Sequence, residues 1–505
     1  MTKNIELQRR TQRALTAFSS PSSLAKSLRS ASSEPDFIAT LVAIYVFLLE
    51  SRVLDLSPIY WLHIPMVLLI VLVLLTVAKG NFRITFESKI SITFALFTAW
   101  VVLSVPFSKW RFASMGPLQS QLQALLIFVI IVQAIRTPAA YRKITGAYAY
   151  AILVASLMSF YLGRSVENGR LALAGGTLGD PNEFALALVV GLPFWWDKAN
   201  LATGARKVYC LLCTIPIFVS FMKTGSRSGL FTLLMLVFVT FILASISRKM
   251  LIAAGAAVLV LASIFLLPDY IKARYQTIFS PADVASLSAG DARHLNSDIA
   301  SSEERKALLT QSIEMTFKNP IFGVGPGVFS YASWDERKAT SGIGGIAQVT
   351  HNTYTQISSE TGIPGFILFF VVMVMVLKAS FSGYRSLRDT DPLFASSGRY
   401  LFSLLAAFSV GIFFLSVGYT HIVSTLFALT VALTNLQQKF AVQAPANEKA
   451  IAQASVSPRP VSPKPLVPAA TPAWARGVLP NSKALRRAGL TGKRTTIESV
   501  AQKPS

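Results

Sequence analysis

The residues of this chain that could do chemistry are few, because most of the sequence is apolar. His351 lies in Thr350-His351-Asn352-Thr353-Tyr354, at the end of a long polar segment and just before Gly362-Ile363-Pro364-Gly365. A histidine can act as a general base near neutral pH when it reaches an acceptor hydroxyl. The alternative is an interfacial histidine that only hydrogen-bonds a loop carbonyl. His421 is a rival for the role of base.

Two arginines could hold an anion. Arg227 lies in Lys223-Thr224-Gly225-Ser226-Arg227-Ser228-Gly229, a connection into an apolar helix, where its guanidinium can grip a phosphate through two N–H groups. It could instead only extend from a helix end to the membrane surface. Arg305 follows Ser301-x-x-Glu304, which fits a capping box and predicts an amphipathic helix from about Ser302 to Phe317. Such a helix would hold Arg305 at the membrane interface.

Periodicity gives this predicted helix one apolar face and a clear end. Asn319-Pro320 stops it, since proline cannot continue a helix. The segment Gly323-Val324-Gly325-Pro326-Gly327 follows and predicts a tight turn that brings backbone close to another group, which the sequence does not identify. The turn fits neither the dinucleotide-binding nor the Walker pattern. The face is expected to hold Leu308, Leu309, Ser312, Ile313, Thr316 and Phe317.

Five further residues are candidates for substrate binding. Arg170 and Asn182 frame the polar segment that runs from Gly175 to Glu183, although Asp180 or Asn182 could simply cap the following helix. Tyr354 shares a helical face with His351, and the glycine turn could approach a ligand or be structural. The candidates are Arg170, Asn182, Tyr354, Gly325 and Gly327.

The composition excludes a soluble domain. Hydrophobic residues make up 52% of the 505 residues and charged residues 14%, and the mean hydropathy is +0.52. Apolar runs are long enough to cross the hydrocarbon core of a membrane, where only helices satisfy their own backbone groups. The prediction is an all-α polytopic membrane bundle of about twelve helices. The runs are 36–56, 58–78, 88–106, 118–135, 143–163, 183–197, 206–222, 228–246, 250–268, 363–381, 400–417 and 420–437.

The net charge of +23 sets orientation rather than indicating nucleic acid. With the N-terminus inside, short inner loops hold 15 Lys and Arg residues and short outer loops hold 7, which is the positive-inside bias. We expect no cleavable signal peptide, both termini in the cytoplasm of a bacterial inner membrane, and the loop 269–362 in the periplasm. Membrane lipids are the expected partners of the basic surface.

These features divide the chain into five expected parts. A basic cytoplasmic tail (1–35) precedes nine spans (36–268), the periplasmic loop with its amphipathic helix (269–362) and three further spans (363–437). The last part, 438–505, is a Pro-rich basic tail that is expected to be disordered because it cannot bury an apolar core.

The residue types at the outer side favour one kind of chemistry. Two arginines and a histidine are predicted there, without an acidic pair or a cluster of metal ligands. Cys210 and Cys213 lie in an apolar run and are read as helix packing. This set suits a lipid substrate that carries a pyrophosphate: the cations hold the leaving diphosphate and a base deprotonates the acceptor. No metal and no cofactor are expected.

Four motifs in this order resemble the O-antigen ligase and O-antigen polymerase superfamily of bacterial inner-membrane glycosyltransferases. They are Gly179-Asp180-Pro181-Asn182, Gly225-Ser226-Arg227-Ser228-Gly229-Leu230, Arg305 with the segment Asn319–Gly327, and His351-Asn352 with Gly362-Ile363-Pro364-Gly365. The resemblance covers residues 165–436.

The resemblance implies a glycan donor on undecaprenyl pyrophosphate, with Arg227 and Arg305 on the pyrophosphate and His351 activating the acceptor. The acceptor would be a lipid A–core in a ligase or a growing glycan in a polymerase, and transfer to lipid A–core is slightly favoured. A transporter or flippase is the remaining alternative. Deep charged residues are scarce in the predicted spans, which disfavours it.

Overall fold

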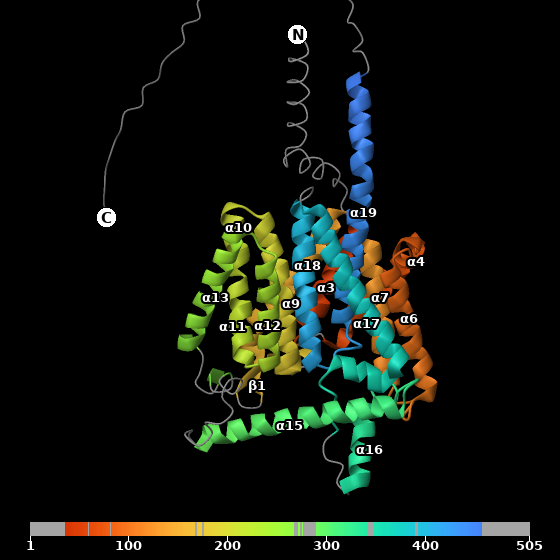
Figure 1. The fold of residues 1–505 in the computed structure, drawn as a ribbon, viewed down its shortest axis with the longest axis vertical. Coiled ribbons are helices and arrows are strands. Elements are labelled where there is room, and N and C mark those ends of the chain that lie inside the picture. The colour runs from red at the N-terminus through yellow and green to blue at the C-terminus, as the bar shows by residue number, and fades with distance from the viewer. Residues whose placement is uncertain are drawn as a thin grey trace, which may run out of the picture. The chain divides into compact units, whose positions relative to one another are not determined.

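The computed structural model describes residues 36–456, apart from 59, 81, 167–168, 174–175, 267–270, 273–274, 276–288, 342–346 and 389–391. Within this described part the regular secondary structure is helical except for one two-stranded hairpin (Figure 1). The predicted tail 1–35 lies outside the described residues, as does the part of the C-terminal tail beyond Val456. Contacts divide the chain at Ala444, and residues 445–456 continue the last helix.

The bundle is assembled from three groups of helices in chain order. The first group comprises α3 (Phe37–Ser51), α4 (Ile64–Lys79), α5 (Arg83–Phe86), α6 (Lys89–Ser104), α7 (Met115–Ala134) and α8 (Pro138–Leu162), with the 3-10 turns η1 (Tyr60–Leu62) and η2 (Val105–Phe107). The second comprises η3 (Gly176–Gly179), α9 (Pro181–Leu201), α10 (Gly204–Leu212), α11 (Thr214–Thr224), α12 (Arg227–Ile242) and α13 (Ile246–Leu266). The third comprises α15 (Ala289–Lys318), α16 (Phe329–Ser341), α17 (Thr353–Leu387), α18 (Pro392–Gly411), η5 (Ile412–Phe414) and α19 (His421–Val456).

The helical membrane architecture predicted from composition is confirmed. Among the described residues, seven helices are long and apolar enough to cross a membrane, and α3 and α12 are shorter apolar helices. Each of the twelve predicted runs overlaps a helix, but the count of twelve spans is not confirmed. Apolar side chains such as Met66, Leu74 and Val77 of α4 are more than half exposed, as expected for a surface that faces lipid.

The centre of the bundle is α9, which is buried on almost all sides. Phe184, Leu188 and Trp195 are fully buried along it, and the Trp195 indole N–H donates to the Ala149 carbonyl of α8 at 3.0 Å. The helix contacts α8, α10, α11, α12 and α18. This central position fixes the N-terminus of α9, and with it Asn182, relative to the neighbouring helices.

Between α8 and α9 the chain forms the hairpin of β1 (Gly163–Val166) and β2 (Arg170–Leu173). The strands are antiparallel, with Gly163 opposite Leu173 and Val166 opposite Arg170. The hairpin therefore places Arg170 at the start of β2, where it is buried. Because β2 contacts α8, α9 and α11, the hairpin is anchored to the bundle.

The long helix α15 crosses one end of the bundle, which we call the α15 end (Figure 1). The predicted start of this helix at Ser302 is wrong, since α15 begins at Ala289 and the Ser301-x-x-Glu304 motif lies inside it. No proline interrupts residues 289–318, so serine and glutamate continue the helix instead of capping it. The predicted end is confirmed, because α15 stops at Lys318, directly before Asn319-Pro320.

The predicted apolar face of α15 is correct in part. Leu308, Ser312 and Thr316 are buried as expected, and α15 packs on α17. Ile313 is 43% exposed and Phe317 is 72% exposed, whereas Met315 is fully buried in their place. The buried stripe is rotated toward Met315 because the segment Val324–Ala332 packs there and forms a small core with Leu308 and Met315.

The contact between α8 and α9 depends on a glycine. A Cβ at Gly191 would lie 2.6 Å from a methyl carbon of Ile152, so Gly191→Ala should overpack the interface and destabilise the protein by about 1–3 kcal/mol. Gly255→Ala in α13 is the matched control, since a Cβ there meets nothing within 4 Å. Thermal unfolding in detergent, followed by tryptophan fluorescence, should show a lower Tm for Gly191→Ala alone. Equal Tm values for the two variants would contradict this packing.

Candidate functional site

Asn182 connects three segments at the α15 end. Its side-chain oxygen accepts hydrogen bonds from Arg170 Nη2 at 2.8 Å and from Ser226 Oγ at 2.9 Å. Arg170 also donates from Nε to the Thr224 carbonyl at 3.0 Å. Asp180 caps α9 by accepting from the backbone N–H groups of Asn182 and Glu183. The cap fixes Asn182, and Asn182 in turn fixes the turn between α11 and α12.

This arrangement makes Arg170 and Asn182 positioning residues. Both side chains are buried, at 5% and 6% exposure, and the hydrogen bonds above direct their polar atoms into the protein. Their predicted contact with substrate stays a prediction. The structure gives them an internal role that the sequence pattern did not indicate. Arg170 and Asn182 are 12 residues apart, and their spacing alone does not show that their side chains form a hydrogen bond.

Arg227 begins α12 directly after this turn. Gly225 adopts the left-handed conformation with φ 56°, and Ser226 caps α12 by accepting from the Gly229 N–H at 3.1 Å. A cation in the first turn of a helix is unfavourable by roughly 0.3–1 kcal/mol, because the helix dipole is positive there. Half-buried Arg227 therefore does not serve helix stability. The helix N-terminus and the guanidinium together suit an anion.

His351 occupies a strained backbone position that its surroundings hold in place. Its φ is 52°, in the left-handed region that few residues other than glycine adopt. On one side, Thr350 Oγ1 lies 2.8 Å from Ser416 Oγ. On the other side, Asn352 caps α17, and Thr353 Oγ1 donates to the Leu415 carbonyl at 2.6 Å. Strain that neighbouring contacts maintain is typical of functional positions.

The environment of His351 favours the neutral, basic form of its imidazole. The side chain is half-buried, and its pKa is lowered, first by burial and then by the positive charge of Arg305. Asp180 and Glu304 oppose this shift with their negative charges. The structure thus brings His351, Arg305 of α15 and the cap of α9 into electrostatic contact. A histidine with a lowered pKa is unprotonated near neutral pH and able to accept a proton.

The glycine turn binds to a kink in α17. Gly362 has φ 74°, which breaks the helix, and Pro364 lacks an N–H group. Backbone N–H groups of Val324 and Gly325 donate to the carbonyls of Ser359 and Glu360, at 2.8 and 3.0 Å. A Cβ at Gly325 would collide with Ser108, and a Cβ at Gly327 would collide with Pro117. The predicted close approach is confirmed, and its partner is protein.

A buried carboxylate, Glu360, completes this contact. It is 3% exposed and accepts from the Gly327 N–H at 2.9 Å and from the Phe329 N–H at 3.4 Å. No sequence motif indicated Glu360, because it lies in an otherwise ordinary helical stretch. Trp100 of α6 donates its indole N–H to the Thr361 carbonyl at 2.8 Å. Backbone groups that the kink releases are therefore satisfied by two separate segments, the glycine turn and α6.

Tyr354 and His421 are engaged within the protein. The Tyr354 hydroxyl donates to the Ser409 carbonyl at 3.0 Å, and its ring lies near Phe369 and Phe413. His421 Nε2 lies 3.7 Å from the carboxylate of Glu50, which is 3% exposed at its side chain. The predicted contact of Tyr354 with substrate stays a prediction. His421 remains a rival base, although its imidazole faces a buried acidic partner.

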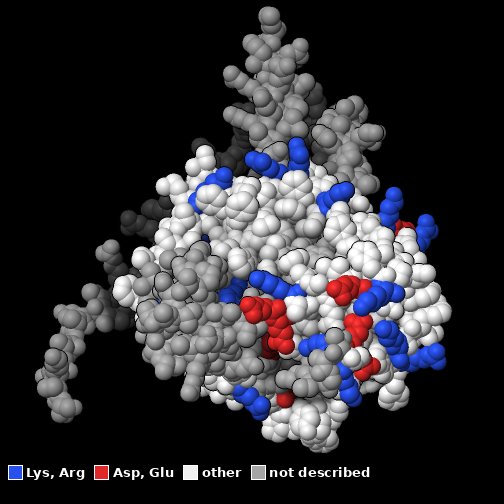
Figure 2. Space-filling model, turned by 60° about the horizontal axis from the view of Figure 1, so that its bottom comes forward, with Lys and Arg blue, Asp and Glu red and all other residues white. Residues whose placement is uncertain are grey.

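Charged side chains gather on the α15 end. Figure 2, which brings this end forward, shows Lys and Arg side chains next to Asp and Glu side chains. Within the described ranges, no three His, Cys, Asp or Glu residues are close enough to share a metal ion. Cys210 and Cys213 are free and buried, in agreement with a packing role.

The electrostatic coupling of His351 can be tested by titration. Arg305→Met removes a charge that lowers the pKa of His351, so that pKa should rise. Asp180→Asn removes a charge that raises it and keeps an oxygen to cap α9, so the pKa should fall further. NMR of histidine-labelled protein in detergent measures both shifts, with His351→Gln to assign the signal. Shifts in the same direction, or none, would contradict the geometry.

Comparison with known proteins identifies the part of the chain that carries these features. Residues 212–370 match the O-antigen ligase family, a range that holds Arg227, Arg305, His351, the glycine turn and the α17 kink. Arg170, Asn182 and the segment 416–420 lie outside it. No curated protein matches the chain.

The match and the apolar helices agree in what they support. They indicate a multi-pass membrane protein with an O-antigen ligase or polymerase type of function, acting as a glycosyltransferase-like enzyme on lipid-linked glycans and polysaccharides in general. Over residues 212–370, the chain is therefore similar to the O-antigen ligase superfamily.

Proposed function

We propose that this protein transfers a glycan from undecaprenyl pyrophosphate to an acceptor hydroxyl at the α15 end, without a metal ion. In this proposal the α15 end faces the periplasm of the inner membrane and both termini are cytoplasmic. The observation that carries the proposal is the position of His351, where the strained backbone is held by its neighbours and where burial and the charge of Arg305 lower the pKa of the imidazole. A base and a cation in electrostatic contact suit an acceptor that loses a proton and a leaving group that is an anion.

The proposed reaction is a single displacement at the anomeric carbon of the donor. His351 accepts the proton of the acceptor hydroxyl while the oxygen of that hydroxyl forms a bond to the anomeric carbon. The bond from the carbon to the diphosphate oxygen breaks, and the electron pair leaves with undecaprenyl pyrophosphate. Arg227 and Arg305 stabilise the charge that develops on the diphosphate. The proton passes from His351 to solvent, which restores the base.

The buried hydrogen bonds explain how the cations would be held for this step. Arg170 and Asn182 fix the turn before α12, so Arg227 begins its helix at one defined position. Preorganised cations cost little reorganisation when charge develops. Arg305 is held in a comparable way, because it lies on α15 and this helix packs on α17.

The acceptor defines the biological product. Ligation to lipid A–core is favoured here, since residues 212–370 match a family described as O-antigen ligase. Polymerisation would use the same base and donor but a growing glycan as the acceptor. The two reactions therefore share every residue named above and differ in what the acceptor site binds.

The roles of the three residues predict a graded loss of transfer. His351→Ala should lower the transfer rate by about 10²-fold or more, the usual contribution of a general base. Arg227→Lys and Arg305→Lys should also lower the transfer rate, because lysine keeps the charge but cannot bind a phosphate bidentately. The assay is glycan transfer by purified protein with lipid-linked donor extracted from membranes. His421→Gln is the matched control and should retain activity.

Size-exclusion profiles in detergent would show that each variant is folded. An active His351→Ala protein would refute the assignment of His351 as base. Loss of activity in His421→Gln together with an active His351→Ala would transfer the role to the pair of His421 and Glu50.

A further inference from the structure

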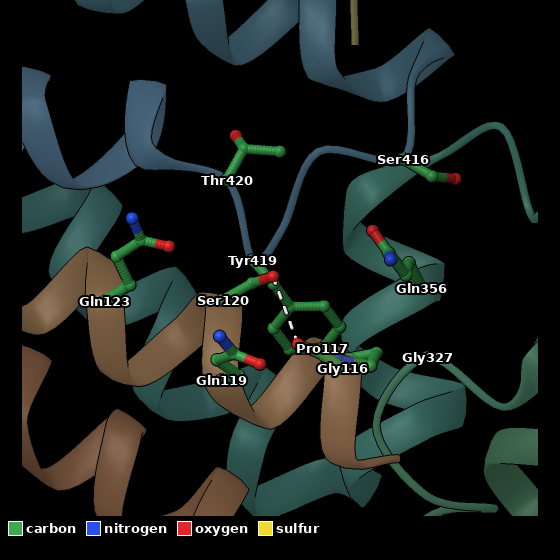
Figure 3. A pocket seen from close by; sticks show the side chains of 10 residues that line it. All are labelled: Gly116, Pro117, Gln119, Ser120, Gln123, Gly327, Gln356, Ser416, Tyr419 and Thr420. Atoms are coloured by element: carbon green, nitrogen blue, oxygen red, sulfur yellow. Dashed lines mark hydrogen bonds between the residues drawn. The ribbon is translucent and has the colours of Figure 1, made fainter. Parts of the chain in front are cut away.

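A cavity of about 570 Å³ opens where four segments meet, and the proposed reaction has not used it (Figure 3). Its volume lies within the roughly 300–1,000 Å³ of small-molecule sites. The first turns of α7 form one wall, the glycine turn contributes Gly327, and α17 and the segment before α19 form the rest. The lining residues are Gly116, Pro117, Gln119, Ser120, Gln123, Gly327, Gln356, Ser416, Tyr419 and Thr420.

The chemistry of this lining differs from that of the two arginines. None of the lining residues that the structure describes carries a formal charge, although charged side chains gather elsewhere on the same end (Figure 2). Three glutamine amides and three aliphatic hydroxyls supply both donors and acceptors. Such a surface fits a ligand with many hydroxyl groups and no charge. It does not fit a diphosphate, which requires cations.

Two hydroxyl groups of the cavity, those of Ser120 and Thr420, keep acceptor capacity. Ser120 Oγ donates to the Gly116 carbonyl at 3.1 Å, and Thr420 Oγ1 donates to the Val417 carbonyl at 2.8 Å. Each oxygen therefore still has lone pairs for a ligand hydroxyl. Gln119 and Ser120, which Figure 3 shows on the first turns of α7, are exposed. These two residues are accessible from outside.

The inner wall is held rigidly, which favours binding of a defined ligand. Gln356 is 8% exposed, and its side-chain oxygen accepts from the Gly418 N–H at 3.2 Å. Gly327 lies against Pro117, where no Cβ could fit, and its N–H is bound by Glu360. The cavity is thus built on the same docked glycine turn that orders the rest of the α15 end.

The cavity adjoins the segment that carries His351. Ser416, which lines the cavity, lies 2.8 Å from Thr350, the residue directly before His351. Gln356 lies in the first helical turns after His351. A sugar in this cavity would therefore be bound next to the proposed base, while the diphosphate would be bound by arginines of α12 and α15.

We infer that this cavity binds a pyranose unit of the acceptor glycan and so positions its hydroxyl for transfer. The assignment to acceptor rests on the proposed function, because it depends on His351 being the base. The sugar chemistry rests on the cavity alone. Gln119, Gln123 and Ser120 would be specificity-determining residues outside the part of the chain that matches the family.

The kinetic test measures the two substrates separately. Gln119→Leu and Gln123→Leu keep side-chain size and remove the amide, so each should raise the acceptor KM about 10-fold, the effect of losing one or two hydrogen bonds. The donor KM should not change. Leu122→Ala is the matched control, since Leu122 lies on the same helix, is 42% exposed and does not line the cavity.

A rise in the donor KM alone would overturn the assignment to acceptor, and unchanged KM values would overturn the cavity as a substrate site. The second measurement does not need transfer. Saturation-transfer NMR with the oligosaccharide released from the acceptor glycolipid should give a signal with His351→Ala protein and none with Gln119→Leu/Gln123→Leu protein. A signal with both proteins would refute binding in the cavity. Binding to an inactive wild-type protein would refute the proposed reaction alone.

Discussion

The α15 end depends on the contact between the glycine turn and the kink in α17. A helix that breaks inside a membrane protein leaves backbone groups that must find partners, because an unsatisfied buried group costs free energy comparable to a lost hydrogen bond. Here Val324, Gly325 and Trp100 donate to the carbonyls that the kink releases, and Ile363 donates its N–H to the Pro320 carbonyl at 2.8 Å. Glu360 satisfies two further N–H groups from the opposite side.

This contact determines where the proposed chemistry can take place. It joins the end of α15, and so the helix that carries Arg305, to the short first part of α17 that follows His351. The same contact supplies Gly327 to the wall of the neutral cavity. A second contact, centred on Asn182, fixes the start of α12 and Arg227. Two buried polar clusters, rather than the apolar core itself, therefore set the relative positions of the base and the cations.

The helical membrane architecture and the order of the motifs could be predicted from the sequence, because apolar runs and glycine or proline signals depend only on neighbouring residues. The helix overlapping each predicted run, the stop at Asn319-Pro320 and the close approach of Gly325 are all confirmed. The predicted start of α15 at Ser302 was wrong, since a capping motif inside a helix has the same spacing as one at its start. Sequence spacing also could not show which segments meet.

Residues that act through distant partners were therefore missed. Glu360 and Gln356 lie among ordinary helical residues, Glu50 lies at the end of an apolar helix, and Gln119 and Gln123 look like a polar face of a short helical turn. The role of such a residue depends on segments that are distant in the sequence, as in the contact between Glu360 and Gly327, which are 33 residues apart. Substrate contacts of Arg170, Asn182 and Tyr354 stay predictions, and the structure adds an internal role for each.

In the proposed reaction this protein consumes an undecaprenyl-pyrophosphate-linked glycan. Mass spectrometry of such lipids, extracted from a deletion strain and from the same strain expressing His351→Ala protein, tests it most directly. Both strains should accumulate the lipid-linked glycan, as long polymer if the protein is the ligase or as single repeat units if it is the polymerase. Wild-type levels of these lipids in the deletion strain, or normal turnover with His351→Ala, would contradict it.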